Sequence, residues 1–160
     1  MGMNRIAVIA LAGWLASLSP SYAALAAGTM ITLGDTTSVP IERLKAGDML
    51  SAPGGKMLPV VAVAPVSQPG PMLTITTDKG RSLTITEGHQ VPVQDEGGIH
   101  LADSIQAGDL VMTETGAETV ISVTAAPAGT AAYRITVGEP GTTARDPLFA
   151  NGVLVSDEPS

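Results

Sequence analysis

The feature that most constrains the fold of this 160-residue chain is an internal repeat. Four short motifs recur in the same order further along the chain: residues 46–48 at 107–109, 60–63 at 120–123, 73–76 at 133–136, and 89–93 at 151–155. The offsets are 61, 60, 60 and 62 positions. Four matches in order at almost constant spacing indicate a duplication rather than coincidence. Two copies are too few for a solenoid, so the two halves are expected to wrap one shared core.

The repeated motifs lie on segments that have the pattern of short strands. Residues 72–77 and 82–86 alternate apolar and polar side chains, and the turn at 78–81 joins them into a predicted hairpin. Gly and Pro are frequent, and helical periodicity is almost absent apart from one short turn at 41–44. The pattern predicts an all-β fold made of two β subdomains related by a pseudo-twofold axis. Further strands are predicted at 30–33, 49–50, 60–63 and 91–93.

Residues 1–23 have the pattern of a secretory signal. Arg5 supplies one positive charge, residues 6–18 form a 13-residue apolar run, and Ser21 and Ala23 are small residues at the positions that signal peptidase reads. The apolar run is shorter than the roughly 20 residues that a membrane-spanning helix needs. We therefore expect cleavage after Ala23 and a periplasmic or secreted protein. The alternative is an uncleaved N-terminal anchor.

Charge and residue usage exclude several functions for the part of the chain after this segment. Residues 24–160 carry seven basic and 15 acidic side chains, a net charge of −8, which disfavours binding to nucleic acid or to an anionic membrane. The chain has no Cys and only two His residues, so we expect no disulfide, no metal and no other cofactor. Asp48 and Asp109 each follow a glycine and are interpreted as turn residues, the alternative being a calcium site. We expect a monomer.

A threonine and a histidine, Thr86 and His89, flank a predicted turn between two strands. This spacing can direct one hydroxyl and one imidazole at the same peptide group. The alternative role is structural, in which His89 hydrogen-bonds a buried carbonyl group and Thr86 satisfies the end of a strand. Pairing between the two halves is expected to bring this turn close to residue 24 and to the final strand.

Four blocks of the sequence resemble those of Hint domains, the self-processing modules of Hedgehog proteins and inteins. Each block alone is a weak signal, but their order and the duplication together are specific for the fold. The resemblance covers residues 24–157 and leaves 158–160 as a tail that we expect to fray. The blocks are Ala-x-x-x-Gly-Thr-x-Ile at 24–31, Pro-Ile-x-x-Leu-x-x-Gly-Asp at 40–48, Thr-x-x-His at 86–89, and a closing block at 149–155.

The resemblance implies a role for particular positions. In the family, the first residue is a Cys or Ser that attacks the preceding carbonyl, the block threonine holds the scissile peptide, and the block histidine assists departure of its nitrogen. In inteins, a penultimate His and a terminal Asn complete the cleavage. This chain keeps Thr86 and His89, but has Ala24 at the nucleophile position and Ser156 and Asp157 at the last two. A methyl group cannot attack a carbonyl, and an ionised Asp has no amide nitrogen to offer.

These departures predict a Hint-fold protein that has lost self-processing and acts as an exported scaffold or binding module for an unidentified protein partner. The alternative is a residual autoproteolytic enzyme that cleaves its own N-terminal peptide with His89, Thr86 and water. A third hypothesis is one part of a split system that receives its nucleophile from another chain. If signal peptidase cuts after Ala23, Ala24 becomes a free amine, and His89 has no amide left to activate.

Overall fold

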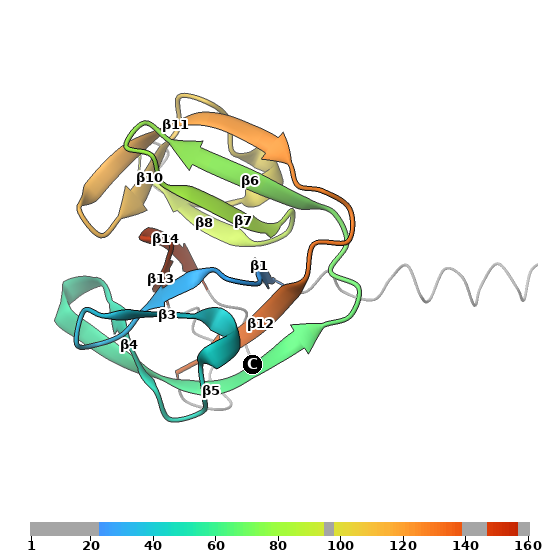
Figure 1. Cartoon of the computed structure of the whole chain (residues 1–160). Helices are drawn as coiled ribbons and strands as arrows, with labels where there is room; N and C mark the ends of the chain where they lie inside the picture. The colour runs from blue at the N-terminus through green and yellow to red at the C-terminus, as the bar shows by residue number, and fades with distance from the viewer. Residues whose placement is uncertain (1–22, 95–97, 139–146, 157–160) are drawn as a thin grey trace, which may run out of the picture.

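The computed structural model describes residues 23–94, 98–138 and 147–156 (Figure 1). These residues form strands linked by turns and by three single-turn 3-10 helices, η1 (Ile41–Arg43), η2 (Pro53–Gly55) and η3 (Ala102–Ser104), so the predicted all-β fold is confirmed. No helix within these residues is long and apolar enough to cross a membrane. The strands are β1 (Leu25–Ala26), β2 (Met30–Thr32), β3 (Ser38–Pro40), β4 (Met49–Ala52), β5 (Lys56–Val66), β6 (Met72–Thr77), β7 (Ser82–Thr86), β8 (Gln90–Val93), β9 (Gly98–Leu101), β10 (Leu110–Thr113), β11 (Gly116–Ala125), β12 (Ala132–Val137), β13 (Pro147–Ala150) and β14 (Val153–Ser156).

The strands pair in the order β3-β2-β13-β14-β8-β10-β11-β6-β7-β1-β12-β5-β4, with β9 added beside β8. In Figure 1, β6, β7, β8, β10 and β11 form the upper part of the molecule, and β3, β4, β5 and β12 form the lower part. The short β1 lies between the two parts, paired with β7 on one edge and with β12 on the other. The connections from β5 to β6 and from β11 to β12 both cross between the parts, at the right of the view.

The pairing registers show the duplication in three dimensions. β5 of the first half pairs with β12 of the second, and β11 of the second half pairs with β6 of the first. The pair Val63–Ile135 in one ladder corresponds to Val123–Ile75 in the other, a shift of 60 positions in both strands. Both ladders are also irregular at the corresponding place near their ends. The halves therefore exchange their long strands, in agreement with the predicted pseudo-twofold arrangement.

β1 and β7 are equivalent strands at the centre of this arrangement. Leu25 on β1 pairs with Ile85 on β7, and the two positions are related by the same shift of 60. The outer neighbours of β1 and β7 correspond as well. Leu25 pairs with Tyr133 on one side, and Ile85 pairs with Leu73, the residue 60 positions before Tyr133. Two residues that pair with each other and are each other's equivalents lie on either side of the pseudo-twofold axis.

One of the four sequence matches, that of residues 89–93 with 151–155, is wrong. The shift of 60 positions shown by the strand pairing makes His89 equivalent to Thr29 instead. The two residues close turns of the same kind: His89 N–H donates to Thr86 O over 3.0 Å, and Thr29 N–H donates to Ala26 O over 3.1 Å. The segment after residue 152 forms β14, which pairs with β8 rather than repeating it. The match misled because two neighbouring strands that bury side chains in one core share the same Val-rich pattern.

The fully buried residues of the core that the two halves share are all aliphatic. Burying each large aliphatic side chain stabilises the fold by about 1.5–3 kcal/mol. Leu25 and Ile85 are fully buried at its centre, so the strand that carries the candidate site is anchored by packing on both sides of the axis. The largest fully buried members include Leu25, Ile31, Ile41, Leu50, Ile75, Leu83, Ile85 and Leu148.

Asp48 and Asp109 close equivalent turns, as predicted. In each turn the aspartate carboxylate accepts the N–H of the residue three positions earlier, that of Lys45 over 3.0 Å and that of Gln106 over 2.9 Å. No group of three His, Asp or Glu side chains within the described residues could hold a metal ion. The calcium alternative therefore has no support in this part of the chain.

Candidate functional site at the start of β1

The backbone of Ala24, just before β1, is held by the end of β7. Ala24 N–H donates to Thr86 Oγ1 over 3.1 Å, and Thr86 N–H donates to Ala24 O over 3.0 Å. Both residues are fully buried. The first bond fixes the peptide group that joins Ala23 to Ala24, which is the group that the resemblance assigns to the block threonine. The structure thus brings residue 24 and the predicted turn together.

His89 lies in the same turn and is 2% exposed. Its Nδ1 is 3.3 Å from the carbonyl oxygen of Gln90. A carbonyl oxygen only accepts, so this contact places the hydrogen on Nδ1 and leaves Nε2 with its lone pair. Burial lowers the pKa of His89 from 6.5 to about 4, against a smaller opposite effect of the Gln90 carbonyl. At pH 7 the imidazole is therefore neutral, and its Nε2 can accept a proton but has none to donate.

Ser156 lies beside this turn, on the final described strand. Its side chain is 2% exposed, and it pairs in the β14–β8 ladder with Gln90, the residue that follows His89. The structure therefore brings Ser156 close to the turn in space, as we expected of the final strand. Asp157 lies outside the described residues.

The peptide bond between Ala23 and Ala24 is called the junction below. An apolar groove of about 760 Å³ lies over it. Its walls are the connections that include residues 65–73 and 125–133, which the shift of 60 positions relates to each other. Met72 and Ala132, which line the groove, pack against Ala24 in a small apolar cluster. This groove could not be predicted from the sequence, because its two walls come from different halves and meet only after the halves have paired.

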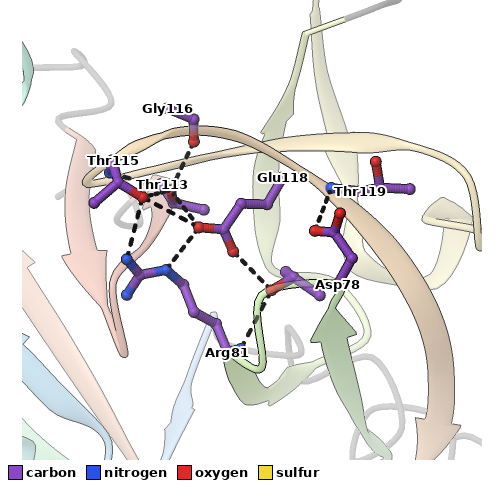
Figure 2. Close-up of polar contacts among 8 residues, drawn as sticks. Asp78, Arg81, Thr113, Thr115, Gly116, Glu118 and Thr119 are labelled. Atoms are coloured by element: carbon purple, nitrogen blue, oxygen red, sulfur yellow. Dashed lines mark hydrogen bonds and ion pairs between the residues drawn. The ribbon is translucent and has the colours of Figure 1, made fainter.

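A buried carboxylate, Glu118, lies at the corner where the β6–β7 and β10–β11 turns meet (Figure 2). Glu118 is 3% exposed, and it accepts hydrogen bonds from Thr77 over 2.7 Å, Arg81 over 3.0 Å and Thr113 over 3.0 Å. Desolvation raises the pKa of Glu118, but these hydrogen bonds and the Arg81 charge outweigh it, so that the pKa is lowered overall. An ionised carboxylate with this many donors is a satisfied structural group.

The sequence contains a signal that could have found this cluster. Glu118 lies two positions before the buried Val120 on β11, so both side chains are on the same, inward-facing side of the strand. A charged residue at an inward position of a strand needs partners, because leaving it alone in the core is strongly unfavourable. Thr77 and Arg81, near the predicted 78–81 turn, supply them.

Comparisons with known proteins place the fold. No protein-family model and no curated protein matches the chain in sequence. The DnaB intein from Synechocystis sp. PCC 6803 matches the structure with a TM-score of 0.69 at 18% identity, over 85% of this chain and 99% of that one. This chain has the Hint fold. The gp41-1 intein matches with a TM-score of 0.65 at 16% identity, over 83% of this chain and 97% of that one. The MchDnaB-1 intein matches with a TM-score of 0.65 at 20% identity, over 84% and 99%.

The Hint fold predicted from the four sequence blocks is therefore confirmed, at identities that establish the fold alone. Within this Hint domain, the position expected to hold a nucleophile carries a methyl group enclosed in an apolar cluster. The backbone geometry can hold a peptide group at Ala24, but the side chain there cannot form an ester or a thioester.

Proposed function

We propose that this is an exported Hint-fold protein that holds its N-terminal junction without cleaving it and serves as a β scaffold or binding module. The observation that carries the proposal is the state of Ala24: its N–H is bound by Thr86, whereas its side chain is a buried methyl group. The acyl shift that would begin self-processing needs a hydroxyl or a thiol at this position. By analogy with protease knockouts, losing the nucleophile of a coupled catalytic unit lowers the rate on the order of 10⁶-fold.

The state of His89 supports the same proposal. An amide nitrogen leaves only after it gains a proton, and a neutral histidine can supply one only after taking it from the attacking group. The methyl group of Ala24 offers no such proton. His89 is neutral at pH 7, and the contact of its Nδ1 with the Gln90 carbonyl leaves no hydrogen on Nε2. This arrangement suits a buried histidine that satisfies a carbonyl group, which is the structural role considered from the sequence.

The binding part of the proposal rests on the groove over the junction. Its volume of about 760 Å³ falls in the range of roughly 300–1,000 Å³ that is typical of binding sites. Its walls include several proline and alanine residues from both connections, with Glu87 as a charged group at one side. Export rests on the signal pattern of residues 1–23.

A second candidate is residual autoproteolysis by water. The observation that favours it is the retained hydrogen bond between Thr86 Oγ1 and Ala24 N–H, which holds the peptide group before Ala24. In this case Nε2 of His89 would accept a proton from water as the water oxygen attacks the carbonyl carbon of Ala23, and would pass that proton to the nitrogen of Ala24 as the C–N bond breaks. The products would be a new carboxylate at Ala23 and an amine at Ala24.

Intact-mass spectrometry of the full-length chain separates the two candidates. The protein is purified with residues 1–23 still attached, incubated at neutral pH without protease, and sampled over several days beside a His89→Ala variant. A constant mass in both proteins is the expected result. Release of a fragment that ends at Ala23 in the wild-type chain, and not in the variant, would refute the proposal and establish the second candidate.

An Ala24→Cys variant tests whether the loss is confined to the nucleophile. Because Thr86 still holds the peptide group, we expect this variant to form some thioester and to release its N-terminal segment when an exogenous thiol is added. The matched control is the wild-type chain, which has a methyl group at residue 24, treated with the same thiol, and intact mass is again the measurement. No thiol-induced cleavage would mean that the surroundings of the junction, and not only residue 24, have changed.

A further inference from the structure

We propose that folding makes the peptide bond between Ala23 and Ala24 inaccessible to proteases, so that a protease can cut after Ala23 only before β1 joins the sheet. The inference rests on the proposed export of the protein, because this bond is also the predicted signal-peptidase site. Folding and removal of the N-terminal segment would then compete, and a chain that folds first would keep the segment.

The first observation is that β1 has no free edge. Proteases bind the residues around a scissile bond as an extended strand, which needs an available backbone edge. Leu25 pairs with Ile85 of β7 on one side and with Tyr133 of β12 on the other. A protease could therefore reach this strand only if one of the two ladders opened.

The second observation is the burial of the residue on the far side of the bond. Ala24 and Leu25 are both fully buried, and Ala24 N–H and C=O are both engaged by Thr86. Ala23 is half-buried, so the boundary between a reachable and an enclosed residue falls at the Ala23–Ala24 bond.

The third observation is that the β5–β6 and β11–β12 connections are each held next to the junction by a backbone hydrogen bond. Ala27 N–H donates to Ala131 O over 2.8 Å, and Glu87 N–H donates to Pro71 O over 3.3 Å. These two bonds are equivalents under the shift of 60 positions, one on each side of the axis. They hold the connections that wall the groove, and with Met72 and Ala132 they enclose the side chain of Ala24.

Limited proteolysis of the full-length chain tests the inference. An elastase-type protease, which cuts after small residues, is added to the native protein and to the same protein in urea that unfolds the chain but leaves the protease active. N-terminal sequencing and intact mass report the rate of cutting at residues 23–27. Because cutting at a structured site follows the population of the open form, we expect it to be about 100-fold slower or more in the native chain.

A matched pair of variants on β7 shows whether the site contacts supply the protection. Thr86→Val removes the hydroxyl that holds Ala24 N–H, and we expect cutting at the junction to become about fivefold faster. Thr84→Val is the control, because Thr84 Oγ1 lies 2.7 Å from Thr74 Oγ1 and takes no part at the junction. If Thr86→Val does not fold, the comparison of native and unfolded wild-type protein still decides.

Equal rates of cutting after Ala23 in native and unfolded protein would overturn the inference. A protease-free sample in the same experiment keeps this result distinct from a failure of the proposed function. Cleavage without protease would refute the absence of self-processing, whereas cleavage only with protease would refute the protection of the junction.

Discussion

Lowering the pH from 7 to 5 is expected to destabilise this protein by about 2 kcal/mol through His89 alone. The pKa of this residue falls from 6.5 to about 4 on folding, because burial disfavours the charged imidazolium. Between these two values the unfolded chain binds a proton that the folded chain does not, so the free energy of unfolding decreases as the pH falls. The contribution is fully present above pH 6.5, and its loss approaches about 3 kcal/mol below pH 4.

Urea unfolding at a series of pH values between 7 and 5 measures this effect. The lower limit of pH 5 keeps the range above the ordinary pKa of Glu118, whose carboxylate also loses stabilising contacts when it is protonated. His89→Gln should abolish most of the pH dependence, even if it lowers stability throughout. His100→Gln, which removes the other histidine of the chain, is the control and should keep it. A His89→Gln variant with the wild-type slope would refute the reasoning.

Two further substitutions test the packing around the site. Glu118→Leu should lower the free energy of unfolding by about 3 kcal/mol, because it leaves buried donors and the Arg81 charge without their acceptor. The control is Asp78→Asn, at an exposed carboxylate of the same corner, which should lower it by less than about 1 kcal/mol. Equal losses in urea unfolding would contradict this. Gly152→Ala should lower the free energy of unfolding by about 2 kcal/mol in the same assay, because φ is 81° there and the new Cβ would overlap Arg81 Nη1. Gly129→Ala, with a φ of 84° and open space around the new Cβ, should lower it by about 1 kcal/mol. A larger decrease for Gly129→Ala than for Gly152→Ala would contradict the role of the overlap.

Local features of the fold could be predicted because they depend on neighbouring residues. The β6–β7 hairpin has the predicted bounds, since alternation and a short turn are both encoded within about fifteen residues. The length of β5 could not be predicted, because only residues 60–63 read as a strand and the observed strand has 11 residues. Its prolines suggest breaks, but the strand changes partner along its length, from β4 at Pro59 to β12 from Val60 onward.

The candidate site was predictable where a recognisable block carries it and where the duplication indicates which segments meet, as it did for residue 24 and the final strand. Thr86 and His89 could be found because they lie three residues apart in a recognisable block. The groove and the Glu118 cluster combine residues from different strands, so their partners are set by pairing registers that no short window contains. The same limitation explains the wrong match of residues 89–93 with 151–155, because the two segments have similar composition but do not occupy equivalent positions in the fold.

The duplication also explains why the fold persists where the reaction is expected to be lost. The shift of 60 positions makes Thr86 the equivalent of Ala26 and Ala24 the equivalent of Thr84. In the first half, the turn is closed by its own Thr29, whose Oγ1 donates to Ala26 O over 2.6 Å, whereas in the second half the Thr86 hydroxyl reaches across the axis to Ala24. The backbone bonds of the two turns are the same.

Chemistry at such a site therefore depends on which half carries a hydroxyl at which position, and not on the framework. A hydroxyl is present at residue 84, where it bonds Thr74, and absent at residue 24, where the family expects its nucleophile. Replacing that one side chain by a methyl group leaves Leu25, Ile85 and both ladders untouched. The framework is stabilised by the shared aliphatic core, so selection for a stable scaffold would retain it without retaining the reaction.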